Sequence, residues 1–324
     1  MISRSPGVPR ISVITAVLNG APTIGRCLAS VAAQGREDVE HLVIDGGSTD
    51  GTQAILEQFG QTQLRWLSER DHGIADAFNK GIALARGECI AILNSDDHLT
   101  SGSLARSLEA LDANPEYGFA FGHCRHQTQG LPDWLNLGDA AYQRRILWRM
   151  PDVNHPTWLV RRRIYQELGG YDPRWCLAMD YEYLLRMQRR GIRGILVPEE
   201  QAVMAMGGIS DRQWMAACRE VRDISLLYGA SWLGATGRMS WYLLRGLIRR
   251  GLVGLGLHRQ VDRIRALNRT RIQHAGREHS AHRYLRRHDI DDRPDSATLI
   301  VKRGASDGYV AASAAVPPRD HGHG

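Results

Sequence analysis

Along the first hundred residues, the pattern of polar and apolar positions defines two kinds of segment that alternate. Runs rich in apolar and β-branched residues, which predict buried strands, occupy 11–17, 40–45, 64–67 and 88–93. Stretches with apolar residues at helical spacing lie between them, at 22–33, 52–59 and 74–85. Strands and helices that alternate in this way predict an α/β fold with a mostly parallel sheet flanked by helices.

The pattern is weaker after residue 100, but it still divides the chain. Further helices are expected at 103–111, up to 168, at 178–190 and from Ser210 to about 228, and further strands at 117–122, 155–160 and 192–197. Residues 126–150 are expected to form an irregular insertion. The main domain should therefore span 1–230, followed by a basic amphipathic helical extension at 231–290 and a disordered tail at 291–324.

Polar side chains stand at the carboxyl ends of the predicted strands. Asn19 follows the first strand, Asp45 ends the second, and Asp96 and Asp97 follow the fourth. Ligands of parallel α/β sheets bind beyond this edge, so the three clusters are expected to converge on one crevice. The adjacent aspartates in IAILNSDD repel each other, which indicates a cation, a proton or open water beside them.

The net charge of +6 is unevenly distributed, because residues 1–230 sum to −3 and residues 231–290 to +10. A basic segment suggests contact with phosphates, although a solvated arginine-rich helix would have the same composition. The five cysteines include no C-x-x-C pair, which argues against a disulfide framework or a zinc site and favours a reducing cytosol. The uncharged run at 224–237 is shorter than the roughly 18–20 apolar residues of a membrane-spanning helix.

Four short stretches carry a family resemblance when they are taken together. They are VIDGGSTDGT (43–52), DHGIADAFNKGIALARGECIAILNSDD (71–97), LGGYDPRWCLAMDYEYLLR (168–186) and MGGIS (206–210). In this order and spacing, over roughly residues 10 to 215, they resemble the inverting family 2 glycosyltransferases with the GT-A fold. The resemblance implies a GT-A-like, Rossmann-type sheet and a non-processive enzyme of polysaccharide or exopolysaccharide biosynthesis, since the chain has no Q-x-x-R-W motif.

The resemblance also implies which residues bind a nucleotide-sugar donor. The position of Asp45 matches the aspartate that contacts the donor's nucleoside, although Gly46 stands where many members have a second aspartate. The segment containing Asp71, Asn79 and Lys80 should lie along the nucleotide. The alternatives are an Asx turn at Asp45, a plain turn at Asp71 and a solvated helix residue at Lys80.

NSDD matches the D-x-D-type motif of the same family, with Asn94 in place of a common aspartate. A departing nucleoside diphosphate gains negative charge, which Mg²⁺ or Mn²⁺ held by carboxylates would neutralise. We expect Asp97 to coordinate the cation directly. We expect Asp96 to contact the ribose or a metal-bound water, and it is a second candidate metal ligand.

Asp180 matches the family's general base and should lie at the start of a helix, where the helix dipole stabilises a carboxylate. An N-cap aspartate is the structural alternative. Glu182, two residues further on, is the second candidate. His155, in NHPTW, is placed by the resemblance near the diphosphate or the acceptor, and a structural histidine is equally consistent with the sequence.

The basic segment has its own pattern. Trp241, Leu244, Ile248, Leu252 and Leu255 share one helical face, which is typical of a helix that lies in a membrane interface but would also suit a face packed on the catalytic domain. The chain is therefore expected in the cytoplasm, with 231–290 at the anionic inner face of the membrane and with a glycan or lipid-linked acceptor. No nucleic-acid partner is expected. The rival functions are a sugar-phosphate nucleotidyltransferase, which would release pyrophosphate, and an arginine-rich nucleic-acid or membrane binder with a non-catalytic α/β domain.

Overall fold

The computed structural model describes residues 8–60, 63–128, 133–147 and 150–255. The chain divides into two compact units, Met1–Gln273 and His274–Gly324, and every described residue belongs to the first. The predicted tail at 291–324 and the later part of the basic extension lie outside the described residues. No helix in the described part of the chain is long and apolar enough to cross a membrane.

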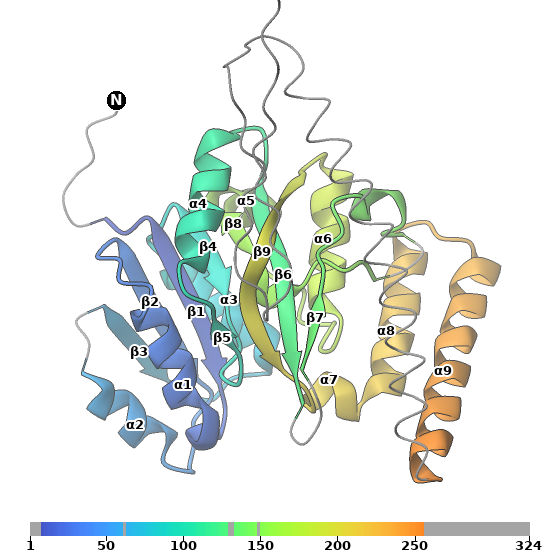
Figure 1. Cartoon of the computed structure of the whole chain (residues 1–324), viewed down its shortest axis with the longest axis horizontal. Helices are drawn as coiled ribbons and strands as arrows, with labels where there is room; N and C mark the ends of the chain where they lie inside the picture. The colour runs from blue at the N-terminus through green and yellow to red at the C-terminus, as the bar shows by residue number, and fades with distance from the viewer. Residues whose placement is uncertain (1–7, 61–62, 129–132, 148–149, 256–324) are drawn as a thin grey trace, which may run out of the picture. The chain divides into compact units, whose positions relative to one another are not determined.

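The first half of the chain forms the parallel part of one sheet (Figure 1). Its strands are β1 (Ile11–Val17), β2 (Val39–Asp45), β3 (Leu64–Ser68) and β4 (Cys89–Ile92), in the order β3-β2-β1-β4. In their register, Val17 pairs with Asp45 and Asp45 with Ser68, so the carboxyl ends of β1, β2 and β3 are level. The predicted parallel α/β arrangement is confirmed.

The second half completes the sheet with mixed pairing. β8 (Leu159–Arg161) is antiparallel to β4, β6 (Phe119–Gln127) is antiparallel to β8, and β9 (Gly194–Ala205) is parallel to β6. β5 (His98–Leu99) and β7 (Trp134–Asn136) are short antiparallel edges on β9 and β6. Two of the predicted strands, 117–122 and 192–197, are too short, because both continue into a β6–β9 ladder that reaches Gln127 and Ala205.

Two other predictions in this half are wrong in part. Residues His155–Thr157 form a 3₁₀ helix, η2, and the strand begins only at Leu159. Pro156 has no backbone N–H to give to a strand ladder, which explains the later start. The single helix expected from Ser210 is interrupted, because α7 (Ile209–Arg212) ends before α8 (Trp214–Leu227) begins.

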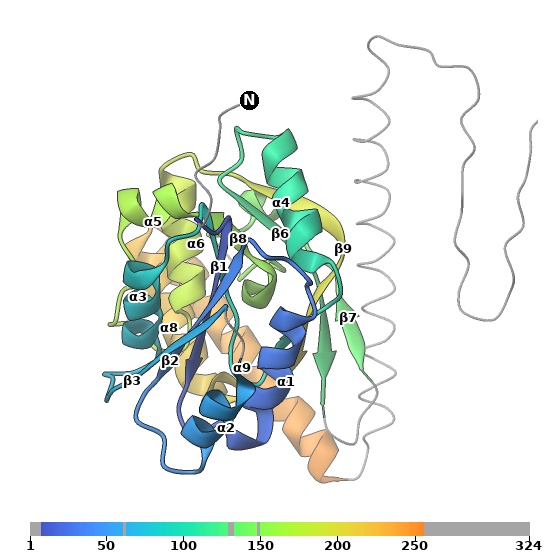
Figure 2. The same cartoon turned by 90° about the vertical axis from the view of Figure 1, so that its left-hand side faces the viewer.

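Helices cover both faces of the sheet (Figures 1 and 2). One face carries α1 (Ala21–Ala32), α2 (Thr52–Phe59) and α4 (Ser103–Ala113). The other carries α3 (Ile74–Leu84), α5 (Arg162–Leu168) and α6 (Met179–Arg189), with Ile224 of α8 in the same core. Alternate residues of β1 enter the two cores, Ile11 and Val13 on one side and Ile14 and Ala16 on the other. A long helix, α9 (Trp232–Gly254), follows α8 at the start of the segment where the extension is predicted.

Candidate active site

The loops that follow β1, β2 and β4 meet at the carboxyl edge of the sheet. The Asn19 N–H donates to Ser48 Oγ over 2.7 Å, and Asn19 Oδ1 accepts from the Thr49 N–H over 2.9 Å. A Cβ atom on Gly20 would lie 3.3 Å from Ser95 Oγ, which places the NSDD loop against the end of β1. The predicted convergence of the strand ends is therefore present.

Asp45 is fully buried at the end of β2. Its carboxylate accepts hydrogen bonds from the backbone N–H and hydroxyl of Ser48, from Ser68 Oγ at 2.6 Å and from Gln53 Nε2 at 3.2 Å. These contacts fix the GGSTDG turn from inside, as the Asx-turn alternative would. The contact predicted between Asp45 and a nucleoside remains a prediction, and no oxygen of this carboxylate faces solvent.

Asp71 reaches the same edge from the end of β3. Its Oδ1 accepts from the Gly73 N–H over 3.0 Å, closing a local turn, and its Oδ2 lies 2.5 Å from where a Cβ atom on Gly46 would stand. The Asp71 carboxylate therefore fills the space that a side chain at position 46 would need. With Asp71 in this place, position 46 has no room for the second aspartate that the resemblance leads us to expect there.

Asn79 and Lys80 are held by other parts of the protein. The Asn79 amide donates to the Tyr171 carbonyl over 2.8 Å and accepts from the Tyr171 N–H over 2.7 Å, so both ends of the amide hold the backbone of Tyr171. Lys80 forms ion pairs with Glu69 at 2.8 Å and with Asp76 at 3.2 Å. The structure gives both residues positioning roles, and their predicted contacts with a nucleotide remain untested.

The two aspartates of NSDD differ sharply in exposure. Asp97 is 1% exposed, and its Oδ1 accepts from the Ala205 N–H over 2.9 Å and its Oδ2 from Asn94 Nδ2 over 3.0 Å. Asp96 is half-buried, and its Oδ2 lies 3.9 Å from where a Cβ atom on Gly208 would stand, in the MGGIS turn. Asp96 is therefore the carboxylate that a ligand can reach, whereas Asp97 is buried beneath the surface of the same loop.

This acid pair is poorly solvated. Burial, followed by the neighbouring charge of Asp96, raises the pKa of Asp97 to about 7, and burial also raises the pKa of Asp96. Arg26 donates to the Asp96 carbonyl over 3.0 Å. Among the described residues there is no group of three or more His, Cys, Asp and Glu that could hold a metal alone. Two oxygen donors with raised pKa values fit a hard divalent cation whose remaining ligands come from phosphate and water.

Asp180 occupies the first turn of α6, as predicted. Its Oδ1 accepts from the Tyr181 N–H over 2.8 Å. Burial raises the pKa of Asp180 to about 6, and the negative charge of Glu220 adds to the effect. A carboxylate with this pKa is ionised at neutral pH and is basic enough to accept a proton from a polarised hydroxyl group.

Glu220 on α8 is a residue that the sequence analysis missed. Its carboxylate accepts hydrogen bonds from three successive backbone N–H groups, those of Cys176 at 3.2 Å, Leu177 at 2.8 Å and Ala178 at 2.9 Å. These three residues immediately precede α6 and fix the entry to the turn that carries Asp180. The only signal in the sequence is an acid in the middle of a predicted helix, which is ordinary for a solvated surface.

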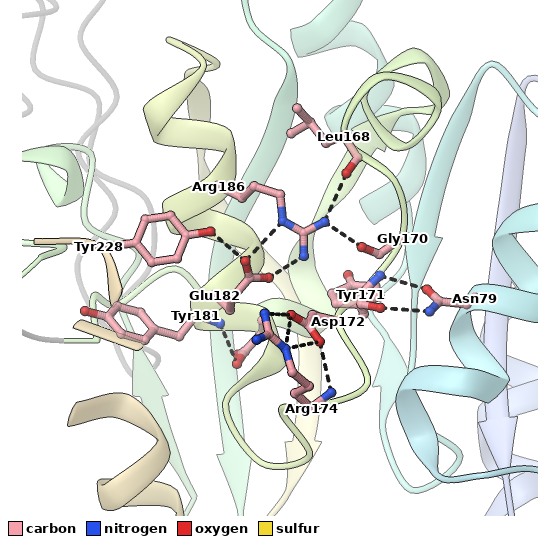
Figure 3. A network of polar contacts seen from close by, with 11 residues as sticks. Asn79, Leu168, Gly170, Tyr171, Asp172, Arg174, Tyr181, Glu182, Arg186 and Tyr228 are labelled. Atoms are coloured by element: carbon pink, nitrogen blue, oxygen red, sulfur yellow. Dashed lines mark hydrogen bonds and ion pairs between the residues drawn. The ribbon is translucent and has the colours of Figure 1, made fainter. Parts of the chain in front are cut away.

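Glu182, two residues after Asp180 on α6, binds inside the protein (Figure 3). It pairs with Arg186 and accepts from the Tyr228 hydroxyl over 2.6 Å. Arg186 also donates to the Leu168 and Gly170 carbonyls at 3.1 and 2.7 Å. This network fastens α6 and α8 to the end of α5, which is a structural role. The alternative role of Glu182 as a second base or acceptor contact stays a prediction.

His155 stands in an aromatic cluster. Its Nε2 lies 2.9 Å from the Tyr171 hydroxyl, and its ring packs edge-on against Trp158 and near Phe78. Burial lowers the pKa of His155 to about 4, so the ring is neutral at physiological pH. The structural alternative accounts for these contacts, and the proposed contact with a diphosphate or an acceptor is not tested by them.

Comparison with known proteins finds similarity to glycosyltransferases. A family model described as glycosyl transferase family 2 matches residues 12–169. The uncharacterized glycosyltransferase Rv1514c of Mycobacterium tuberculosis (strain H37Rv) is 33% identical over 180 residues, which cover 55% of this chain and 68% of that protein. A PGL/p-HBAD biosynthesis glycosyltransferase of Mycobacterium bovis (strain BCG Pasteur) is 29% identical and covers 55% of this chain and 69% of its own length.

A solved structure shows the same fold. The mannosyltransferase PcManGT from Pyrobaculum calidifontis, solved with GDP-Man and Mn²⁺, superposes with a TM-score of 0.56 at 19% identity. The match covers 79% of this chain and 83% of that protein. At this identity the likeness concerns the fold, and it agrees with the mixed sheet and flanking helices described above.

Proposed function

This chain belongs to glycosyltransferase family 2, and from that premise we propose that it transfers a sugar from a nucleotide-diphosphate donor to an acceptor hydroxyl with inversion. The observation that carries the proposal is that two separate sets of carboxylates suit two different roles, cation binding and proton abstraction. A poorly solvated acid pair follows β4, and a single carboxylate with a pKa raised to about 6 begins α6. Direct displacement at an anomeric carbon needs both a stabilised leaving group and a base on the opposite side.

The acid pair would hold a divalent cation, Mg²⁺ or Mn²⁺. When bound, such a cation neutralises the charge that develops on the departing diphosphate. Because Asp97 is 1% exposed and both its oxygens accept internal hydrogen bonds, we assign the direct contact to Asp96. Asp97 then fixes the NSDD loop through its two internal hydrogen bonds and adds negative charge next to Asp96. This assignment reverses the roles that we expected from the sequence.

Asp180 would act as the general base. Its carboxylate is ionised at neutral pH, and the N-terminal turn of α6 stabilises that form. It takes the proton from the acceptor hydroxyl as the oxygen attacks the anomeric carbon. Glu220 keeps the segment before this turn in place through its three backbone contacts. The proposed acceptor is a hydroxyl of a growing or lipid-linked glycan, reached from the cytoplasmic side of the membrane.

A product assay tests this function. The full chain is incubated with a panel of nucleotide sugars, Mn²⁺ or Mg²⁺ and candidate glycan acceptors, and the released nucleotide is identified by chromatography. We expect release of a nucleoside diphosphate with at least one donor. Asp96→Asn and Asp180→Asn should lose this release, whereas Glu109→Gln, an exposed acid on α4, should keep it. Release of pyrophosphate would instead indicate a nucleotidyltransferase, and full activity of Asp180→Asn would remove the proposed base.

A further inference from the structure

Within the described part of the chain, one face of helix α9 packs on the rest of the protein. A Cβ atom on Gly246 would stand 2.5 Å from the Trp214 indole, so α9 crosses α8 with its backbone against that ring. Ala235, 6% exposed, belongs to the same inner face. If the apolar stripe of this helix packed on the catalytic domain, its residues would lie on the same face as Gly246 and Ala235.

The apolar stripe predicted from the sequence lies on the opposite face. Each residue turns an α-helix by about 100°, so Leu244 and Ile248 stand about 200° from Gly246. They are 50% and 54% exposed. The other large apolar side chains with exposed positions on α9 or just after it are Trp232, Leu233, Trp241, Leu247 and Leu255. Leu233, Trp241 and Leu255 of this set stand about 140–220° from Gly246, and together with Leu244 and Ile248 they are called here the outer face of α9.

The charge around the outer face has one sign. The 23 residues of α9 include four arginines and no acidic residue, and the sequence has no Asp or Glu between Asp223 and Asp262. Arg245 is exposed beside the outer face. A solvated surface helix normally mixes both signs, whereas this helix combines exposed Leu, Ile and Trp side chains with guanidinium groups only.

We propose that the outer face of α9 is a membrane-binding surface that lies in the interface of an anionic lipid bilayer. Leucine and isoleucine side chains would enter the acyl boundary, indole rings suit the head-group level, and arginine pairs with lipid phosphate. A symmetric contact between two copies fits less well, because it would bring the same acid-free helix against itself with no counter-charge.

The position of α9 relates the membrane-binding surface to the active site, and this relation rests on the proposed function. α7, which follows the Gly208 turn beside Asp96, and the last turn of α9 lie at the same end of the molecule (Figures 1 and 2). A bilayer against the outer face would therefore run past the end of the molecule that carries the carboxyl edge of the sheet. An acceptor anchored in that bilayer would need to extend only its glycan toward Asp180.

Vesicle co-sedimentation tests the surface without any donor or acceptor. The full chain is mixed with vesicles of phosphatidylcholine alone or of phosphatidylcholine with phosphatidylglycerol, at low and high salt. We expect binding to the anionic vesicles that weakens with salt, and little binding to the neutral ones. Leu244→Glu with Ile248→Glu should abolish it, and Arg245→Gln should weaken it about fivefold. Leu84→Glu, a 41% exposed position on α3, is the matched control and should bind as the unchanged protein does.

Thermal melting of each variant separates lost binding from lost folding, and Arg245→Gln decides the question if the double variant does not fold. The proposal is overturned if the unchanged protein stays in the supernatant with anionic vesicles, or if the double variant sediments as well as the unchanged protein. A concentration-dependent dimer that the double variant loses, without vesicle binding, would assign the face to a second copy. Because sedimentation needs no catalysis, an inactive enzyme that still binds vesicles would contradict the proposed function alone.

Discussion

The turnover number should fall as the pH is lowered through about 6, because Asp180 must be ionised to accept a proton. Burial raises the pKa of Asp180 to about 6 in the folded protein, above the ordinary value of 3.8. The basic form is therefore complete well above pH 6 and is lost on going below it, at a higher pH than for an exposed aspartate. At pH 5 about a tenth of the molecules would carry the base, so kcat should be about tenfold below its plateau.

The assay must separate this titration from that of the acid pair. Asp97, whose pKa is raised to about 7 by burial and by Asp96, has to lose its proton when a cation binds. With donor, acceptor and Mn²⁺ all saturating, the cation keeps the pair ionised and the kcat profile should have a slope of about one. At low Mn²⁺ the acid limb of kcat/KM should be steeper. Asp180→Asn should lower kcat by about 10²- to 10⁴-fold.

Glu220→Gln supplies the matched perturbation. Glutamine retains one acceptor oxygen for the backbone N–H groups of 176–178 but removes the negative charge that helps to raise the pKa of Asp180. The acid limb should move to lower pH, by less than about one pH unit, since burial is the larger cause. A kcat that stays constant down to pH 4.5 in the unchanged enzyme would refute the assignment of Asp180. An acid limb that moves to higher pH in Glu220→Gln would refute the electrostatic role of Glu220.

Mn²⁺ should bind more tightly as the pH rises from 6 to 8, because the charge of a cation at Asp96 favours the ionised form of the neighbouring Asp97, whose pKa burial raises to about 7. Calorimetry in buffers of different ionisation enthalpy would measure the proton release. Asn79→Ala should cost about 1–3 kcal/mol in urea unfolding, because the backbone of Tyr171 loses both partners. An unchanged donor Kd in this variant would support the positioning role, and a much weaker one would restore the predicted nucleotide contact. Gly25→Ala in α1 should stabilise the protein by about 0.5–1 kcal/mol in urea unfolding, because the added Cβ atom would stand in open space. Gly81→Ala in α3 should instead cost about 1–3 kcal/mol, because its Cβ atom would stand 2.3 Å from the Ile14 side chain.

The parallel half of the sheet was predictable because burial on both faces leaves a plain trace in the sequence. Every residue of β1 and β2 is buried; β1 and the 42–44 part of β2 are mainly apolar or β-branched runs that end in polar turns, although β2 also buries Glu40 and His41. The sequence of β9 is not a continuous apolar run. Pro198 and the two glutamates after it interrupt its apolar run, and the structure accommodates them where the β6–β9 register shifts next to Gly122. An irregularity of this kind depends on the partner strand, which the sequence alone does not specify.

The site was predictable in a similar, partial way. Strand ends located Asn19, Asp45 and the NSDD loop, because parallel strands bring their carboxyl ends to one edge, and the family resemblance added Asp71. The partners of each side chain could not be read from the sequence. Asn79 bonds to a peptide 92 positions away, so its segment matches the family's nucleotide-binding stretch while its amide fixes Tyr171. A motif gives the position of a side chain in the fold, and the competing contacts decide whether that side chain is available to a ligand.

The acid–base properties of the site follow from burial and from distant charges, and neither is present in a motif. From NSDD we expected Asp97 to coordinate the cation and Asp96 to contact the ribose or a metal-bound water, yet Asp97 is covered by the end of β9 at Ala205 while Asp96 remains accessible. Asp180 is an ordinary first-turn aspartate in the sequence, and burial together with Glu220, 40 residues later on α8, gives it the basicity of a catalyst. A substitution on α8 should therefore change the pH profile of the enzyme without touching either the donor or the acceptor.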